Sequence, residues 1–316
     1  MANRASLPIV NLRALADGCG DELAKLDTAC RETGFLYLAE HGVDSDLIAR
    51  VRSEVADYFS RPLEAKLNDQ IARDNYRGYI PARFFTPNDA SETADDYEGY
   101  KLHFESAAVE ECDLYGPNRW PAAADELRDS VSRYWQECDR LAITLLIAFA
   151  RIIGADPNAF VALFEQPLTN MTLLHYSADT DRVGIHPHKD TDALTILATD
   201  DTGGLFVRRR DGQWIEAGDQ PDMLVVNIGD MLEIWSGGRF VSTPHKVENR
   251  SGRDRYSFPY FAVPRWDVVI KPICELQDGF EPREIHSGDS SRAIWRSNWP
   301  DAAAVEGRID PGVFNG

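Results

Sequence analysis

The chain has 316 residues, and 43% of them are hydrophobic, which is enough apolar material for a sizeable core in one enzyme-sized unit. Its 52 acidic residues outnumber the 33 basic ones and give a formal net charge of -19, which argues against nucleic acid and against an anionic membrane as partners. No apolar run approaches the ~18 residues of a membrane span, and the five cysteines are scattered without a CxxC pair. We therefore expect a soluble protein of a reducing compartment, by default the cytoplasm.

The first half of the chain predicts mainly helices between short strands. Residues 7–12 (LPIVNL) read as a short strand and residues 35–42 (FLYLAEHG) as a strand and a turn, and apolar residues at helical spacing lie between them. An amphipathic helix is predicted over 44–59, and a long apolar helix over 123–153 ends at Gly154. Residues 74–121 interrupt this pattern with an irregular stretch rich in Asp, Pro, Gly and aromatic residues, and a loop of such length is usually functional or mobile.

From about residue 170 the pattern changes to short strand-like runs separated by Gly or Asp turns. The runs are MTLLHY, GIHPHKD, ALTILAT, LFVRR, QWIEA, MLVVNI, LEIWS, HKVEN and RYSFPYFAV. Many short strands at close spacing favour a sandwich or jelly roll over a Rossmann sheet, and the chain has no GxGxxG motif and no P-loop. The tail from about residue 290 has no clear pattern.

One short stretch, HPHKDTDALTIL, places four polar residues on alternate positions: His186, His188, Asp190 and Asp192. If the stretch is one strand, all four side chains share a face. Burying four such polar side chains without partners would cost too much free energy, so we expect some of them to bind a ligand. His188 and Asp190 could then hold one metal ion from the same side. The later histidines that could complete the site are His245, in STPHKVEN, and His286, in the tail.

Two histidines and one carboxylate form the facial triad of non-haem Fe(II) oxygenases, which leaves coordination positions open for a cosubstrate and oxygen. The HxD spacing alone is a weak signal because it occurs by chance in many chains. Arg255 and Ser257, in RYSFPYF, strengthen it, since an arginine fork and a hydroxyl two residues apart on a strand suit a carboxylate. The sequence therefore predicts a metal next to an anion clamp.

The chain resembles the isopenicillin N synthase-like family of Fe(II)/2-oxoglutarate-dependent oxygenases (non-haem dioxygenases) over nearly its whole length. The resemblance is most specific in HKDTDALTIL, DDTGGLFV, VVNIGDMLEIWSGGRFVSTPHKV and RYSFPYF. It implies a mainly β fold with flanking helices and a distorted double-stranded β-helix (jelly roll) core, in a single catalytic unit over residues 1–316. Within that unit we expect a mostly helical N-terminal part (1–165) with a substrate loop (74–121), the Fe(II)/2-oxoglutarate core (166–270) and a C-terminal extension (271–316).

The resemblance also assigns roles. It implies that His188, Asp190 and His245 bind Fe(II), and that Arg255 and Ser257 hold the far carboxylate of 2-oxoglutarate. Tyr176, in LLHYS, matches a position that often borders the cosubstrate. We expect Fe(II) as cofactor, 2-oxoglutarate and O2 as cosubstrates, and hydroxylation of a small molecule of secondary metabolism, with desaturation or cyclisation as variants and with release of succinate and carbon dioxide. His186 and Asp192 fall outside this ligand set and are expected to support it or to lie in a turn.

The family's general layout and a cluster of aromatic residues indicate where the substrate enters. We expect it beside residues 76–104, with four aromatic side chains as walls: Tyr79, Phe84, Phe85 and Tyr100. His103, at the end of this segment, could touch the substrate, although a surface position is the default expectation.

Two other functions stay open at this point. A related Fe(II)/O2 oxidase would not use 2-oxoglutarate, and Arg255 with Ser257 would then hold a carboxylate of the substrate. A more distant alternative is a non-catalytic β-sandwich module with a structural metal such as zinc. Succinate release distinguishes the first alternative, and oxygen consumption distinguishes the second. Nothing in the sequence selects the substrate or the oligomeric state.

Overall fold

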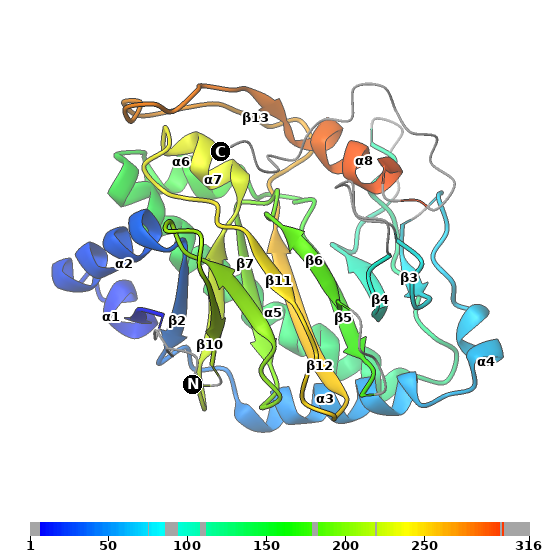
Figure 1. The fold of residues 1–316 in the computed structure, drawn as a ribbon. Helices are drawn as coiled ribbons and strands as arrows, with labels where there is room; N and C mark the ends of the chain where they lie inside the picture. Colours follow the sequence, from blue (N-terminus) through cyan, green and yellow to red (C-terminus); the bar gives the residue numbers. More distant parts are fainter. Residues whose placement is uncertain are drawn as a thin grey trace.

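Two β-sheets form the centre of the protein, a large one and a small one in front of it (Figure 1). The computed structural model describes residues 7–74, 76–85, 94–107, 112–178, 183–218, 220–297 and 299. The large sheet has the order β1 (Ile9–Asn11), β2 (Phe35–Ala39), β10 (Leu224–Ile228), β7 (Leu194–Thr199), β12 (Arg255–Ala262), β5 (Asn170–Tyr176), β4 (Glu98–His103) and β3 (Gly78–Ile80). The small sheet has the order β6 (Ile185–His188), β11 (His245–Val247), β8 (Leu205–Arg208) and β9 (Trp214–Ala217).

A separate apolar cluster joins the facing sides of the two sheets. It contains Leu174, Leu197 and Val225 of the large sheet together with Val207 and Val247 of the small sheet. Neighbouring strands are antiparallel except β1 and β2, which run parallel. Two facing, mostly antiparallel sheets over a common apolar layer make the jelly-roll core that the sequence motifs predicted.

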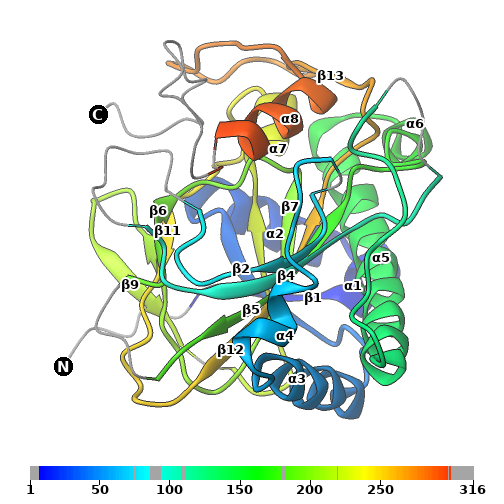
Figure 2. The same cartoon turned by 90° about the vertical axis from the view of Figure 1, so that its right-hand side faces the viewer.

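Helices surround the large sheet, and several of them cover the face that the small sheet leaves free (Figures 1 and 2). They are α1 (Leu12–Ala16), α2 (Gly20–Glu32), α3 (Ser45–Phe59), α4 (Leu63–Leu67), α5 (Asp125–Ile153), α6 (Pro157–Ala162), α7 (Asp230–Trp235) and α8 (Ser287–Ser297). Figure 2 shows α5 and α3 side by side against the sheet, and α5 contacts β7 and β12. The buried stripe of α5 ends at Gly154, whose φ of 76° gives the helix a left-handed C-cap.

The larger core cluster lies on this helical side and contains residues from Val10 to Ile270. None of the helices in the described ranges has both the length and the apolarity that crossing a membrane requires.

Two predictions about local structure were wrong. The run LEIWS was predicted as a strand, but its residues Leu232 to Trp235 end the helix α7. Leu232, Ile234 and Trp235 are all buried, and a short apolar run buried on every side does not distinguish helix from strand. The stretch 74–121 is not irregular throughout, because it contains β3 and β4, which extend the large sheet beside β5. Residues 75, 86–93 and 108–111 of this stretch lie outside the described residues.

The C-terminal part also has more structure than its sequence pattern indicated. Strands β13 (Val269–Ile270) and β14 (Ile285–His286) pair with each other, and α8 follows β14 directly. Both views show α8 in orange-red above the large sheet, at the same end as α7 (Figures 1 and 2).

Candidate metal and cosubstrate site

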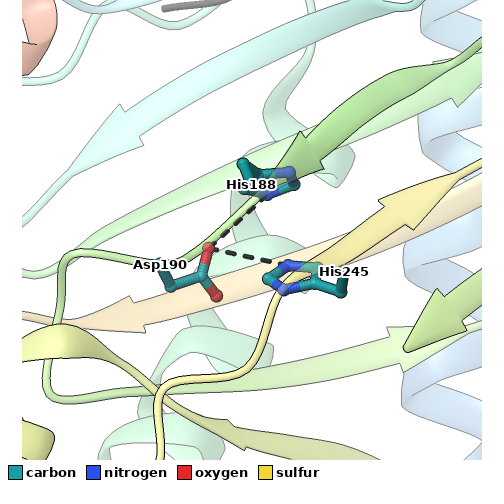
Figure 3. Close-up of side chains that lie close together, drawn as sticks. All are labelled: His188, Asp190 and His245. Atoms are coloured by element: carbon teal, nitrogen blue, oxygen red, sulfur yellow. Dashed lines mark ion pairs between the residues drawn. The ribbon is translucent and has the colours of Figure 1, made fainter. Parts of the chain in front are cut away.

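His188, Asp190 and His245 point toward one another (Figure 3). His188 at the end of β6 pairs directly with His245 at the start of β11, and Asp190 follows in the turn that leads to β7. The Nε2 atoms of both histidines lie 3.7 Å from Oδ1 of Asp190, and the three ligand atoms lie within 4.8 Å of one another. One ion can therefore contact all three side chains.

Backbone carbonyls orient both histidine rings. Nδ1 of His188 lies 2.8 Å from the carbonyl oxygen of His186, and Nδ1 of His245 lies 3.2 Å from that of Thr243. A carbonyl oxygen only accepts hydrogen bonds, so each Nδ1 carries a proton and each Nε2 is left to face the site. Burial and the nearby His188 ring lower the pKa of His245 to about 4, so the His245 ring is neutral at pH 7. Imidazoles whose Nδ1 is fixed in this way are suited to metal ligation through Nε2.

The Asp190 carboxylate is fixed by two donors on neighbouring strands. Its Oδ2 atom accepts hydrogen bonds from Thr195 Oγ1 at 2.5 Å and from Asn227 Nδ2 at 2.7 Å, which leaves Oδ1 toward the histidines. Burial alone would raise the pKa of Asp190, but its electrostatic interactions with the imidazoles of His245 and His188, together with these hydrogen bonds, outweigh burial and lower the pKa. Asn227 was not predicted from the sequence, although a lone amide inside the buried run LVVNI is a usable signal.

Asp192 lies close to the Asp190 carboxylate and contacts the same threonine. Its Oδ2 atom lies 2.9 Å from Thr195 Oγ1, so one hydroxyl contacts the carboxyl groups of both Asp190 and Asp192. Burial and the negative charge of Asp190 raise the pKa of Asp192 well above its ordinary value. A hydroxyl has one proton to donate, so a protonated Asp192 supplies the proton for its own contact and leaves that of Thr195 to Asp190.

The expectation of four polar residues on one strand face was wrong, because β6 ends at His188 and β7 begins only at Leu194. His186 is separate from the metal-binding candidates: its Nδ1 atom lies 2.7 Å from Oδ1 of Asp95. The turn between the two strands, and not strand alternation, brings Asp190 to the histidines.

Arg255 is a buried cation on β12, with only 1% of its surface exposed. It donates from Nε to the carbonyl oxygen of Gly203 at 2.7 Å and from Nη1 to Ser257 Oγ at 3.1 Å. In the described parts of the chain, no carboxylate lies within 4.0 Å of its guanidinium. A buried charge without a counter-charge is costly, so this environment suits an anionic ligand.

Tyr176 lies opposite Arg255 in the register of β5 and β12, and the guanidinium carbon lies 4.9 Å from the centre of its ring. The Tyr176 hydroxyl is buried and makes no hydrogen bond to any described residue. Gly184 packs so closely on the ring that a Cβ there would lie 2.7 Å from it. The chemistry of these groups suits a dicarboxylate such as 2-oxoglutarate, because its oxygens can satisfy both the guanidinium and the orphaned hydroxyl.

Comparison with known protein families and proteins agrees with this geometry. A model of the 2OG-Fe(II) oxygenase superfamily matches residues 168–264, and a model described as "non-haem dioxygenase in morphine synthesis N-terminal" matches residues 7–123. The chain is 30% identical over 313 residues to homoarginine-6-hydroxylase 2-ODD-C23.2 of Arabidopsis thaliana, which covers 92% of this chain and 86% of the relative. The chain belongs to the 2OG-Fe(II) oxygenase superfamily.

Solved structures of this superfamily have the same fold. A full-length protein of Neurospora crassa, solved in complex with alpha-KG and thymine, gives a TM-score of 0.79 at 26% identity and covers 93% of this chain and 98% of that one. JOX2 in complex with 2OG, Fe and JA gives a TM-score of 0.78 at 26% identity and covers 94% of this chain and 87% of that one. The predicted family and jelly-roll core are confirmed, and the protein is a dioxygenase that uses Fe(II) and 2-oxoglutarate.

A cavity of about 270 Å³ opens beside His188 and Asp190 in this oxygenase. Its walls are largely apolar and include Ile80, Phe85, Met231, Phe261, Val263 and Trp295. Trp295 belongs to α8, so the C-terminal extension covers the cavity, which the pattern of the tail did not indicate. Charged side chains also line it, among them Lys101 of β4 and the His186 and Asp95 pair.

Only part of the predicted aromatic wall borders this cavity. Phe85 lines it, and Phe84 packs against Phe85 with their ring centroids 5.1 Å apart. Tyr79 and Tyr100 instead lie on the opposite face of β3 and β4, where both rings pack on Tyr58 of α3. Successive strand residues alternate sides, so the neighbours Ile80 and Lys101 face the cavity in their place.

His103 is not at the surface as expected. It is 4% exposed, and its Nε2 atom lies 3.1 Å from the carbonyl oxygen of Tyr76. Burial, together with the positive charges of Arg77 and Lys101, lowers the pKa of His103 well below its ordinary value, so the ring is neutral.

Proposed function

We propose that this oxygenase hydroxylates a small organic molecule, with Fe(II) held by His188, Asp190 and His245 and with 2-oxoglutarate held by Arg255 and Ser257. The observation that carries the proposal is the combination of a two-histidine, one-carboxylate cluster with a buried arginine that has no carboxylate partner among the described residues. The first group suits Fe(II), and the second suits the far carboxylate of the cosubstrate. Tyr176 borders the same place and offers its unsatisfied hydroxyl.

The bound iron supplies oxygen activation coupled to conversion of 2-oxoglutarate into succinate and carbon dioxide. The residues of the chain contribute position and environment. Thr195 and Asn227 hold the Asp190 carboxylate in one orientation, and Arg255 offsets the negative charge of the cosubstrate. The apolar layer between the sheets keeps water away, which strengthens these electrostatic contacts.

The finer assignments rest on size, charge and relatives. The cavity of about 270 Å³ suits a small molecule. One of the relatives is a homoarginine hydroxylase by name, and the Neurospora crassa protein was solved with thymine bound. Hydroxylation is the outcome we propose, with desaturation or cyclisation as variants at the same site.

The net charge of -19 supports the absence of a nucleic-acid partner, and free cysteines support a reducing compartment such as the cytoplasm. We further propose one catalytic unit, with the core at 166–270.

An anaerobic titration of Fe(II)-loaded protein with 2-oxoglutarate tests the proposal. We expect a visible charge-transfer band typical of a chelated α-keto acid. Arg255→Ala should weaken 2-oxoglutarate binding by about 30-fold or more, because losing one partner of a buried charge pair costs roughly 2–5 kcal/mol. Arg253→Ala is the matched control, since Arg253 is exposed two residues away and pairs with Asp201 on the surface.

Two results would contradict parts of this proposal. If Fe(II) binds but no band forms and oxygen is consumed without succinate, the protein is an Fe(II)/O2 oxidase that does not use 2-oxoglutarate. If His188→Ala and His245→Ala bind Fe(II) as tightly as the wild type, the metal site lies elsewhere.

A further inference from the structure

Lys101 is a buried lysine that faces the cavity beside the metal-binding candidates. It lies on β4, is 3% exposed, and pairs across the sheet with Thr172 of β5. Its ammonium group donates to Asn170 Oδ1 at 2.5 Å and to Thr172 Oγ1 at 2.9 Å. Both acceptors are neutral, and an ammonium group has three donors, so these contacts leave one donor and the whole positive charge unmatched.

No carboxylate in the described ranges lies within 4.0 Å of the Lys101 ammonium. The rings of Trp295 and Phe261 lie near it, with their centres 4.6 Å and 5.0 Å from Nζ. Such rings attract a cation but do not neutralise it. Burial lowers the pKa of Lys101 to about 7, although the nearby carboxyl groups of Asp190 and Asp192 act in the opposite direction.

Other ionisable side chains of the cavity have an ionisable partner of the opposite kind, acid or base, close by. Asp95 contacts His186 at 2.7 Å, and Lys189 lies 3.7 Å from a carboxylate oxygen of Glu233. Asp190 faces the two histidines, and the raised pKa of Asp192 favours its neutral form. Lys101 is thus a cavity cation whose nearest side-chain partners carry no charge.

Lys101 and the 2-oxoglutarate clamp lie on the two strands that flank β5. Lys101 is opposite Thr172, and Arg255 is opposite Tyr176, four residues further along β5. Their backbone positions are therefore roughly 13 Å apart along β5, at about 3.3 Å per residue. In the proposed function Arg255 holds the far carboxylate of 2-oxoglutarate and its other end is chelated at the metal, so the charge of Lys101 is left for a different molecule.

We propose that Lys101 binds a carboxylate of the primary substrate, which would make the substrate a small organic acid with an apolar body. This inference rests on the proposed function, because it concerns the substrate of that same site. The charge of Lys101 selects the anionic group, while Phe85, Met231, Phe261 and Val263 offer apolar contacts to the rest of the molecule. Lys101 is then a specificity-determining residue, and the end of the substrate remote from its carboxylate is directed to the metal.

Calorimetric titration of the anaerobic enzyme with Fe(II) and saturating 2-oxoglutarate tests this inference. The probes are small aryl and alkyl carboxylates, each with its primary amide, such as 3-phenylpropanoate and 3-phenylpropanamide. We expect the carboxylates to bind wild type at least tenfold more tightly than their amides. Lys101→Met and Lys101→Gln should remove this preference and leave 2-oxoglutarate affinity unchanged.

Lys66→Met is the control variant. Lys66 is also buried over two aromatic rings, of Phe59 and Tyr79, but it pairs with Glu98 outside the cavity. It should lose stability and keep the carboxylate preference.

The inference is overturned if no carboxylate binds, if amides bind as tightly as carboxylates, or if the preference survives in both Lys101 variants. Absence of the charge-transfer band, in contrast, contradicts the proposed use of 2-oxoglutarate. Calorimetry of the carboxylates does not depend on that band, so the two failures are distinguishable.

Discussion

The hydroxyl of Thr195 contacts two carboxyl groups, and its bond to Asp190 fixes the orientation of the proposed metal ligand. Thr195→Val keeps the shape of the side chain but removes this bond. Loss of a hydrogen bond that supports a metal ligand typically weakens metal binding by about 10–100-fold, and we expect that loss for Fe(II). Anaerobic competition with a metal chelator measures it.

A matched control for that variant is Thr144→Val, because the Thr144 hydroxyl bonds only to the helix backbone on the exposed side of α5. Its Fe(II) affinity should equal that of the wild type. Equal affinity in Thr195→Val as well would mean that Asp190 is not a ligand or needs no support from this hydroxyl.

Asp139 on α5 gives the stability of the fold a dependence on pH. Burial raises the pKa of Asp139 to about 6, although Tyr260 donates a hydrogen bond to it and lowers the pKa. The folded state therefore holds this proton up to about pH 6, while the unfolded chain releases it near pH 4. Stability from this group is present at low pH and is lost as pH rises from about 4 to 6.

Asp139→Asn should remove this loss, since the amide stays neutral and still accepts the Tyr260 hydrogen bond. We expect the variant to exceed the wild type by on the order of 1–2 kcal/mol in free energy of unfolding at pH 8, and by only about half as much at pH 5. Urea unfolding at both pH values measures the difference. The same difference at both values would contradict a titrating Asp139.

Among single residues, the ones that could be predicted from the sequence are those that lie in recognisable motifs, such as His188, Asp190 and Arg255. Lys101 and Asp95 could not be predicted, because their partners Asn170 and His186 are distant in sequence and only the folded structure brings them together. A buried lysine also has no sequence signal of its own, since most lysines are exposed.

At the scale of elements, the turn between β10 and α7 supports the segment that carries Asp190. Gly229 N donates to the carbonyl oxygen of Ala193, and the next two amides donate to those of Asp190 and Asp192. A Cβ at Gly229 would lie 2.1 Å from Oδ1 and 2.3 Å from the backbone oxygen of Asp192. Only glycine allows two backbones to approach this closely.

Gly229→Ala should therefore displace the 190–193 segment. We expect a loss of about 1–3 kcal/mol of stability, as for overpacked cores, together with weaker Fe(II) binding. Gly154→Ala is the control, because a Cβ there meets no atom within 4 Å and adds only the strain of its positive φ, about 1 kcal/mol. Thermal unfolding and Fe(II) affinity are measured for both. Unchanged Fe(II) affinity in Gly229→Ala would show that this turn does not position the site.

Strand existence was predictable from apolar runs, whereas the face that each side chain takes was not. Tyr79 and Tyr100 form part of an aromatic cluster in the sequence, yet they pair across β3 and β4 and point at Tyr58 of α3. Which face of β3 and β4 borders a cavity depends on what packs on each side, and both sides of these strands are buried. The prediction of a strand for the apolar run in α7 failed for a similar reason, since burial on every side removes the periodic pattern of apolar and polar residues.

At the scale of the whole molecule, a strongly acidic protein must admit an anionic cosubstrate. The formal net charge is -19, while the groups proposed to receive anions, Arg255 and Lys101, are buried cations. At 0.01 M salt the Debye length of about 30 Å lets an approaching dianion sense the whole negative charge. At 0.15 M it falls to about 8 Å, so only nearby groups act on the ligand.

The association rate of 2-oxoglutarate with the Fe(II)-loaded protein should therefore rise several-fold as NaCl increases from about 10 to 150 mM, because salt screens the long-range repulsion before it affects the buried arginine. Stopped-flow absorption of the charge-transfer band measures the rate. Mannitol at matched osmolarity is the control and should leave the rate unchanged. A rate that falls with salt would mean that the local positive charge of Arg255 outweighs the net charge of the protein even at long range.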